Sequence, residues 1–334
     1  MNYIGSKNKL SGFLLETITD VAGQNLQDKI FCDLFAGTGI VGRRFKGLVR
    51  RVISNDIEYY SYVLIRNYIG NVKKLNYQSY FDALNNCPII ETGFVYQNYC
   101  LGSGCGRQYF SDENGKRIDT WRQQIERWKI GKEINNDLYF FLLASLLEGA
   151  DKVANTASVY GAYLKRLKKS AWQAIKLQPA EFDLDSRVHQ VFNMDSNELI
   201  QQISGDILYL DPPYNARQYG ANYHLLNTIA GYTSFKPQGK TGLPAYYRSP
   251  YCYKNSVLEQ FEDLLKKADF KYIFLSYNNE GLMSQQQVRQ IMQKFGKYQR
   301  VEKAYQRFKA DTDEKRNHKA KNTLEYIHIL EKSL

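Results

Sequence analysis

Short apolar runs alternate with amphipathic stretches along most of the chain. Apolar runs typical of buried strands lie at 30–35, 51–54, 188–192, 207–210, 272–275, 301–308 and 324–330. Apolar residues recur at helical spacing near 13–21, 138–147, 258–265 and 288–295. This alternation predicts a parallel sheet that is covered by helices on both faces. The last two strands are joined by a very polar link and predict an antiparallel hairpin at the sheet edge.

Two long segments interrupt the alternation. Residues 85–136 are polar and weakly periodic, and residues 215–256 are irregular and rich in Tyr and Gly. Asp56 and Asp195 end two strands that we expect to be neighbours, yet they lie 139 positions apart, far more than a crossover needs. We therefore predict an α/β domain formed by 1–75 and 187–334, with a separate module inserted at 76–186.

A glycine-rich turn follows the first predicted strand. Gly37, Gly39 and Gly42 are spaced as G-x-G-x-x-G, and Asp56 ends the next strand. Small residues at such a turn let a bound nucleotide approach the backbone, and the downstream acid accepts hydrogen bonds from ribose hydroxyls. The βαβ unit therefore predicts a nucleotide-cofactor site. By itself it does not distinguish NAD from S-adenosylmethionine.

The predicted strand at 207–210 ends in Asp211-Pro212-Pro213-Tyr214. Neither proline has a backbone N–H and both have a fixed φ, so this turn is stiff and presents carbonyl acceptors. Asp211 adds a carboxylate acceptor and Tyr214 adds a flat ring. The combination suits a planar group that carries an NH2 donor, such as an extruded adenine. An ordinary turn at a strand exit is the alternative, since Asp-Pro and Pro-Pro are common turn signals.

Composition narrows the classes of protein. The 334 residues carry a formal net charge of +11 with 27 Tyr and 17 Phe, which favours a partner with phosphates and stackable bases. The five cysteines do not form the ligand set of a structural zinc site, so we expect no metal and reduced thiols. Without a membrane-spanning run or a signal-peptide pattern, we expect a cytoplasmic protein with no membrane contact.

Four motifs in order carry a family resemblance: Tyr3 to Lys7, Asp33 to Gly39, Asn55-Asp56 and Asp211 to Tyr214. With them, 1–75 and 186–332 resemble the D12-class adenine-N6 DNA methyltransferases. Two further stretches, 158–165 and 215–219, are similar to methyltransferases of type II restriction-modification systems. The resemblance implies a Rossmann-like methyltransferase sheet that uses S-adenosylmethionine as its cofactor.

The resemblance also implies which residues bind the cofactor. These are Tyr3, Lys7, Phe35, Gly37, Gly39, Asp56 and Asp195. Lys7 would lie near the methionine carboxylate, Asp56 would bind the ribose, and Asp195 would accept from the adenine NH2. Local structural roles remain the alternatives: helix caps for the two aspartates, core packing for Phe35 and a solvated charge for Lys7.

Catalysis is assigned by the resemblance to Asp211, Pro212 and Tyr214. Asp211 and the Pro212 carbonyl would accept the two N–H groups of the target adenine and pull its nitrogen towards tetrahedral geometry. They would also stabilise the positive charge that develops there. Tyr214 would stack on the base, which must first leave the duplex.

The inserted region, 76–186, is expected to recognise the target in double-stranded DNA. Its basic run offers phosphate contacts, although a solvated helix face would have the same composition. The residues expected to contact DNA are Lys165, Arg166, Lys168, Lys169, Arg217 and Tyr219. We expect a monomer that works beside a restriction endonuclease without needing to touch it. The resemblance includes enzymes that read short palindromes, CATG among them, without fixing the recognition sequence.

Other functions fit parts of this pattern. N6 methylation of RNA, or N-methylation of a protein amide, would use the same chemistry. A non-catalytic nucleic-acid-binding relative would keep the fold alone, and an NAD-dependent oxidoreductase would share the glycine-rich turn. The basic insertion favours a polynucleotide, the N-terminal motif favours the DNA class, and no feature supports a hydride-transfer site.

Overall fold

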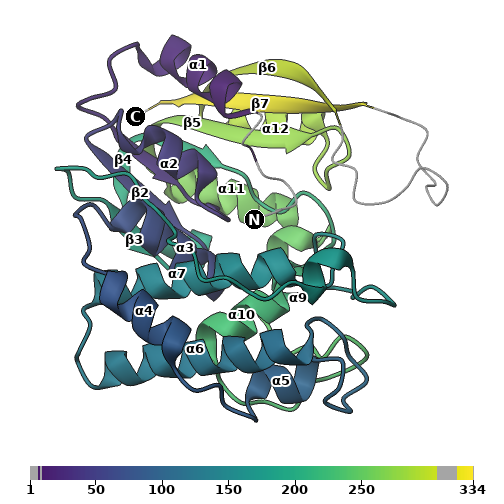
Figure 1. Cartoon of the computed structure of the whole chain (residues 1–334). Coiled ribbons are helices and arrows are strands. Elements are labelled where there is room, and N and C mark those ends of the chain that lie inside the picture. Colours follow the sequence, from purple (N-terminus) through teal and green to yellow (C-terminus); the bar gives the residue numbers. More distant parts are fainter. Residues whose placement is uncertain (1–6, 8–9, 307–321, 334) are drawn as a thin grey trace. The chain divides into compact units, whose positions relative to one another are not determined.

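The computed structural model (Figure 1) describes residues 7, 10–306 and 322–333. The chain divides into two compact units. The first unit comprises Arg66–Leu184 together with Tyr219–Tyr247. The second comprises the described parts of Gly5–Ile65, Asp185–Gln218 and Arg248–Leu334. The first unit thus contains most of the predicted insertion and also Tyr219–Tyr247, which the sequence analysis grouped with the α/β domain.

Within the described residues, seven strands of the second unit form one sheet in the order β3-β2-β1-β4-β5-β7-β6. The strands are β1 (Ile30–Asp33), β2 (Arg51–Asn55), β3 (Gln190–Phe192), β4 (Ser204–Leu210), β5 (Asp269–Asn278), β6 (Gly296–Gln306) and β7 (Asn322–Lys332). β1 to β5 are parallel, while β7 is antiparallel to both of its neighbours, β5 and β6. The predicted fold class, a parallel sheet with an antiparallel hairpin at its edge, is confirmed.

Helices of the second unit cover both faces of the sheet. They are α1 (Ser11–Ala22), α2 (Ile40–Lys46), α3 (Tyr59–Ile65), α8 (Ser196–Leu199), α11 (Val257–Lys267), α12 (Gln285–Met292) and the short η4 (Pro250–Cys252). On one face, Phe45 of α2 stacks on Phe31 of β1 with ring centroids 4.0 Å apart. On the other, Cys32 joins a core with Phe261 of α11. The adjacent Phe31 and Cys32 reach opposite layers because side chains alternate along a strand.

The first unit is built from helices. They are η2 (Arg66–Gly70), α4 (Gln78–Asn86), α5 (Phe94–Tyr99), α6 (Asp112–Ile130), α7 (Asn136–Val153), η3 (Lys169–Trp172), α9 (Tyr219–Asn222) and α10 (His224–Gly231). α6 and α7 pack against each other, and α10 packs against both. None of the helices in the described part of the chain is long and apolar enough to cross a membrane.

The sequence analysis described 85–136 as polar and weakly periodic and did not predict the helix α6 there, and its prediction that 215–256 is irregular was wrong for α10. α6 has 19 residues and begins after Ser111, whose side chain accepts a hydrogen bond from the amide of Asn114. Its buried residues include Ile118, Trp121, Ile125 and Trp128, which recur at helical spacing. This spacing was present in the sequence, but the many polar residues between the apolar ones obscured it.

The strand order reverses between β1 and β4. From β1 the chain proceeds outward to β2 and β3, then returns to place β4 on the other side of β1. In open α/β sheets, ligands bind at the carboxyl ends of the strands where the order reverses in this way. The turns that follow β1 and β4 are therefore the expected location of the site.

Candidate active site

The glycine-rich turn after β1 is fixed by backbone hydrogen bonds to both neighbouring strands. The amide of Leu34 donates to the carbonyl of Tyr209 (3.2 Å), and the amide of Ala36 donates to the carbonyl of Asn55 (2.9 Å). Gly37 and Gly39 have φ values of 54° and 77°, which glycine adopts without the steric cost of a Cβ. The turn therefore joins β1 to α2 through two residues that carry no side chain and are both buried.

Asp56, directly after β2, holds this turn from the side. Its Oδ2 accepts from the amide of Gly37 (2.8 Å), and its Oδ1 accepts from the amide of Glu58 (2.9 Å). Burial raises the pKa of Asp56 to about 6, although the two amide donors oppose this shift. Each carboxylate oxygen can accept a further hydrogen bond. Ribose binding by Asp56 stays a prediction that this geometry permits.

Asp33, the last residue of β1, is a site residue to which the sequence analysis gave no role. Its Oδ2 accepts from the amide of Gly42 (3.0 Å), while its buried Oδ1 has no hydrogen-bond partner among the described residues. Burial raises the pKa of Asp33 to about 8, and the nearby charges of Asp211 and Asp56 add to the shift. This carboxyl group is therefore mostly protonated, and neutral, at neutral pH.

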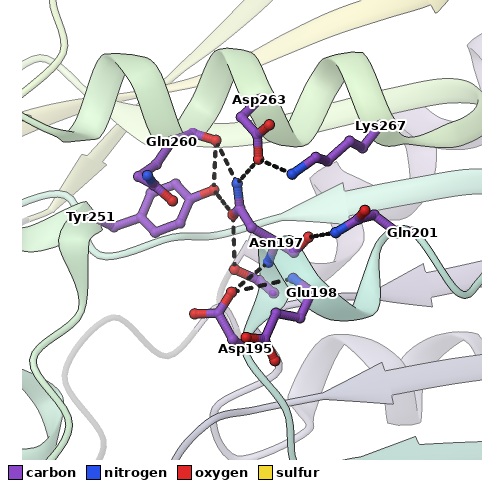
Figure 2. A network of polar contacts seen from close by, with 9 residues as sticks. Asp195, Asn197, Glu198, Gln201, Tyr251, Gln260, Asp263 and Lys267 are labelled. Carbon is purple, nitrogen blue, oxygen red and sulfur yellow. Dashed lines mark hydrogen bonds and ion pairs between the residues drawn. The ribbon is translucent and has the colours of Figure 1, made fainter.

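Asp195 caps the short helix α8, as the local alternative anticipated. Its Oδ1 accepts from the amides of Asn197 (2.8 Å) and Glu198 (3.3 Å). Figure 2 shows the side chain of Asn197 reaching α11, where it donates to Asp263 (2.9 Å). The cap fixes the position of the Asp195 carboxylate after β3. Its contact with the adenine of a cofactor stays a prediction.

Tyr251 links this network to Phe35. Its hydroxyl donates to Oδ1 of Asn197 (2.8 Å), and its ring meets the ring of Phe35 nearly edge-on at a centroid distance of 5.2 Å. Tyr251 is buried and Phe35 is half-buried. Phe35 thus packs on the core while part of its ring stays accessible, and its role in cofactor binding stays a prediction.

Asp211 follows β4 and forms an ion pair with a buried lysine. Nζ of Lys7 lies 3.1 Å from Oδ1 of Asp211 and 2.8 Å from Oε1 of Glu325. Burial by itself would lower the pKa of Lys7, but the two carboxylates raise it well above its ordinary value. Burial raises the pKa of Asp211 to about 6, and Lys7 opposes that shift. Lys7 is thus paired within the protein, not solvated, and its contact with the cofactor stays a prediction.

Glu325 was not recognised in the sequence analysis. It shares one face of β7 with Ile327 and Ile329, because side chains alternate along a strand. Charged residues are almost never buried unless they are paired. A carboxylate followed by two isoleucines on the same face of a strand was therefore the signal that could have identified it.

The rest of the turn after β4 is anchored to the core. Pro212 is buried, and Tyr214 is half-buried against the core of the second unit. The carbonyl of Tyr214 accepts from the amide of Leu282 (2.9 Å), which follows β5. Burial raises the pKa of Tyr214, so its hydroxyl stays protonated. The catalytic roles of Asp211, Pro212 and Tyr214 stay predictions.

The residues expected to contact DNA lie in both units. Lys165, Arg166 and Lys169 are exposed in the first unit, and Arg217 is exposed in the second. Lys168 is half-buried and donates from Nζ to the carbonyl of Thr156 (2.8 Å). Tyr219, in the first unit, stacks with Tyr223 at a centroid distance of 6.1 Å. DNA contact by these residues stays a prediction.

Two further expectations concern the contact of Tyr3 with the cofactor and the absence of a metal site. Tyr3 lies outside the described residues. Within the described residues, no group of three or more His, Cys, Asp or Glu could hold a metal ion.

Comparison with known proteins gives consistent matches. Residues 3–291 match the sequence model of the D12 class N6 adenine-specific DNA methyltransferases. Type II methyltransferase M.NlaIII of Neisseria lactamica is 64% identical over the full length of both chains. Type II methyltransferase M.CviAII of Paramecium bursaria Chlorella virus 1 is 38% identical, with 93% of each chain covered. Type II methyltransferase M.FokI of Planomicrobium okeanokoites is also 38% identical, but this chain covers only 53% of it.

Proposed function

Since the chain belongs to the D12 class of N6 adenine-specific DNA methyltransferases, we propose that it methylates an adenine flipped out of duplex DNA, with S-adenosylmethionine as the methyl donor. One observation carries the proposal: the acceptors of Asp211 and Pro212 lie where the strand order reverses. The glycine-rich turn after the neighbouring strand β1 lies at the same edge of the sheet.

The residues around the turn after β1 fit this cofactor. Gly37 and Gly39 add no side chain to the turn, and Asp56 and Asp195 offer carboxylate acceptors at the ends of β2 and β3. Phe35 presents part of a ring. A nucleoside needs acceptors for its hydroxyl and amino groups and an apolar surface for its base, and this set provides both. When bound, S-adenosylmethionine supplies an activated methyl group on a sulfonium.

The protein must make the target amino group nucleophilic, since its nitrogen lone pair is delocalised into the adenine ring. Asp211 and the Pro212 carbonyl would accept its two N–H groups and favour tetrahedral geometry at that nitrogen. Their negative and partial negative charges would stabilise the positive charge that develops on it. Tyr214 would hold the ring by stacking. The remaining contribution is alignment of the reacting atoms, which positioned side chains supply.

Replacement of Asp211 tests the proposal. The native protein, S-adenosylmethionine labelled with tritium in its methyl group, and duplex DNA should give label at N6 of adenine. Asp211→Ala should give none, while its calorimetric affinity for the cofactor stays within about threefold of the native value. Asp269→Ala, an exposed residue at the other end of the sheet, should behave as native. A fully active Asp211→Ala protein would contradict the proposal.

We further propose that this methylation is site-specific and protects DNA from a cognate restriction endonuclease. M.NlaIII and M.CviAII, which match over their full or nearly full length, are both named type II methyltransferases. Sequencing of methylated adenines in the genome of an expressing host should reveal one short motif. DNA from that host should resist endonucleases that cut at this motif. Scattered methylation without a motif would contradict site specificity, and label on RNA in place of DNA would favour the RNA alternative.

A further inference from the structure

Three charged side chains from distant parts of the sequence meet beside the turn after β4. Lys7 lies between Asp211 at 3.1 Å and Glu325 at 2.8 Å. Lys7 and Glu325 are 7% and 8% exposed, so water contributes little to solvating either charge. All three residues belong to the second unit. The cluster is thus a buried ion triad in contact with the predicted catalytic carboxylate.

Glu325 reaches this position because β7 runs against the direction of the other strands. Glu325 is paired with Asn278, the last residue of β5. Next to β5 lies β4, in which Leu210, the residue before Asp211, is paired with Leu275. The beginning of β7 therefore lies at the same sheet edge as the carboxyl ends of the parallel strands. A residue near the end of the sequence is brought to the site by the edge hairpin.

The charges of the triad do not cancel. One ammonium group is shared by two carboxylates, so the triad as a whole is negative when Asp211 is ionised. Without Glu325, the whole charge of Lys7 would be directed at Asp211 and would offset the charge of its carboxylate. With Glu325 present, Lys7 is drawn partly away. Interactions between charges are strong here because the surroundings are poor in water.

The proposed reaction depends on that balance. The adenine amino nitrogen would become positive as its lone pair bonds to the methyl group, while the methyl–sulfur bond breaks and its electron pair stays on the sulfur. The nitrogen would then release a proton to water. A carboxylate that retains negative charge stabilises the positive nitrogen, whereas one fully neutralised by a lysine does so less. Asp211 by itself would suffice to pair Lys7. A structural ion pair therefore does not require Glu325, and burying a second carboxylate is costly.

We propose that Glu325 is a positioning residue for methyl transfer: it holds Lys7 between two carboxylates, so that the Asp211 carboxylate keeps more of its negative charge towards the target amino group than it would if paired with Lys7 alone. This inference rests on the proposed function and concerns a residue beyond 3–291, the range matched by the family's sequence model.

The pH dependence of the reaction distinguishes this role from a structural one. Among the described residues, the titratable groups that act on Asp211 or respond to it are Lys7, Glu325, Asp33, Tyr209 and Tyr214. Glu325 contributes to raising the pKa of Asp211, whereas Lys7 lowers it. Removing the charge of Glu325 should therefore lower the pKa of Asp211. The acid limb of the rate profile should then move to lower pH.

The experiment compares Glu325→Gln with the native protein in single-turnover methyl transfer to duplex DNA, from pH 5 to 9. Gln keeps the size of the side chain and an oxygen that can accept from Lys7, but it removes the charge. We expect the plateau rate to fall at least about tenfold and the acid limb to move to lower pH, while cofactor and DNA affinities stay within about twofold. Glu325→Asp, which keeps the charge, should recover part of the rate and the native acid limb.

The control is Glu331→Gln, an exposed position on the same strand, which should match the native protein. A Glu325→Gln variant with native rate and an unmoved acid limb would overturn the inference. So would a rate loss fully accounted for by weaker cofactor binding. If Glu325→Gln does not fold, Glu325→Asp decides, because an acid limb displaced despite the retained charge would also overturn it. A native protein that fails to methylate DNA would contradict the proposed function instead.

Discussion

The backbone amide of Gly37 donates a 2.8 Å hydrogen bond to the carboxylate of Asp56, so the acid that ends β2 holds the turn that follows β1. The glycine-rich turn and Asp56, which together predicted a nucleotide site, are therefore joined directly by a hydrogen bond. Asp56 can act in two ways: by fixing the turn and by accepting from a ribose. Substitutions that separate the charge of Asp56 from its hydrogen bonds should distinguish these contributions.

We expect Asp56→Ala to lower cofactor affinity at least about tenfold, because a ribose acceptor and the turn's support are lost together. The free energy of unfolding should fall by about 1 to 2 kcal/mol, as is usual when a buried amide loses its acceptor. Asp56→Asn, which keeps one acceptor oxygen, should lie between Ala and native. Calorimetric titration and urea unfolding provide both measurements. Native affinity in Asp56→Ala would contradict a role for Asp56 in cofactor binding.

Because the pKa of Asp33 is raised in the folded protein, we expect the free energy of unfolding to fall as pH rises. This pKa is raised from 3.8 to about 8 in the folded protein, mainly by burial, so the folded state binds a proton more tightly than the unfolded state does. The resulting stabilisation is complete below pH 3.8 and is lost as pH rises through about 8. Asp33→Asn stays neutral and should lack this dependence.

Urea unfolding at pH 6 and pH 9 tests this expectation. Asp33→Asn should gain stability relative to the native protein as pH rises, and the difference between the two should change by about 2 to 3 kcal/mol from pH 6 to pH 9. Asp28→Asn, an exposed change shortly before β1, should follow the native curve. If the free energy of unfolding changes equally between pH 6 and pH 9 in Asp33→Asn and in the native protein, Asp33 does not titrate in this range.

Tyr251 should influence cofactor binding without touching the cofactor. Tyr251→Phe keeps the ring that meets Phe35 but removes the hydroxyl that donates to Asn197. Losing this buried hydrogen bond should cost about 1 kcal/mol of stability and loosen the helix that Asp195 caps. We expect cofactor affinity to fall about two- to tenfold with little change in the single-turnover rate at saturation. Tyr253→Phe, an exposed neighbour, is the control, and equal affinities in both variants would count against the link.

The exposed cations of the first unit should account for part of the salt dependence of DNA binding. We expect the combined replacement of Lys165, Arg166 and Lys169 by Ala to weaken binding at low salt. The slope of log affinity against log salt should become shallower by up to about 3, since each lost phosphate contact removes about 0.9. Cofactor affinity should not change. Fluorescence anisotropy with labelled duplex measures this, with exposed Lys266→Ala as control. An unaltered slope would place the DNA contacts elsewhere.

The sheet could be predicted from the sequence because its strands are strongly apolar and its turns carry distinctive residues. Ile30–Asp33 and Ser204–Leu210 each end at a motif that identified the strand before it. The edge hairpin was predicted from two strand patterns joined by a polar link. The helix α6 was missed because polar residues outnumber the apolar ones along it, so that its apolar face gives only a weak periodic signal.

The site was predictable only where its residues belong to local motifs. The support that Asp56 gives to Gly37 follows from adjacent strand ends, and the sequence analysis anticipated that proximity. The pairing of Lys7 with Glu325 depends on β7 lying beside β5. The sequence around either residue therefore does not indicate this pairing. The raised pKa of Asp33 likewise results from how completely the surrounding layers exclude water.

The hydrogen bond between Lys7 and Glu325 joins residues 318 positions apart. During synthesis, Lys7 and Asp211 emerge from the ribosome well before the strand that carries Glu325. An unfinished chain can contain both sequence motifs of the site and still lack its second carboxylate. We therefore expect the active site to be complete only after β7 has been translated and has joined the sheet.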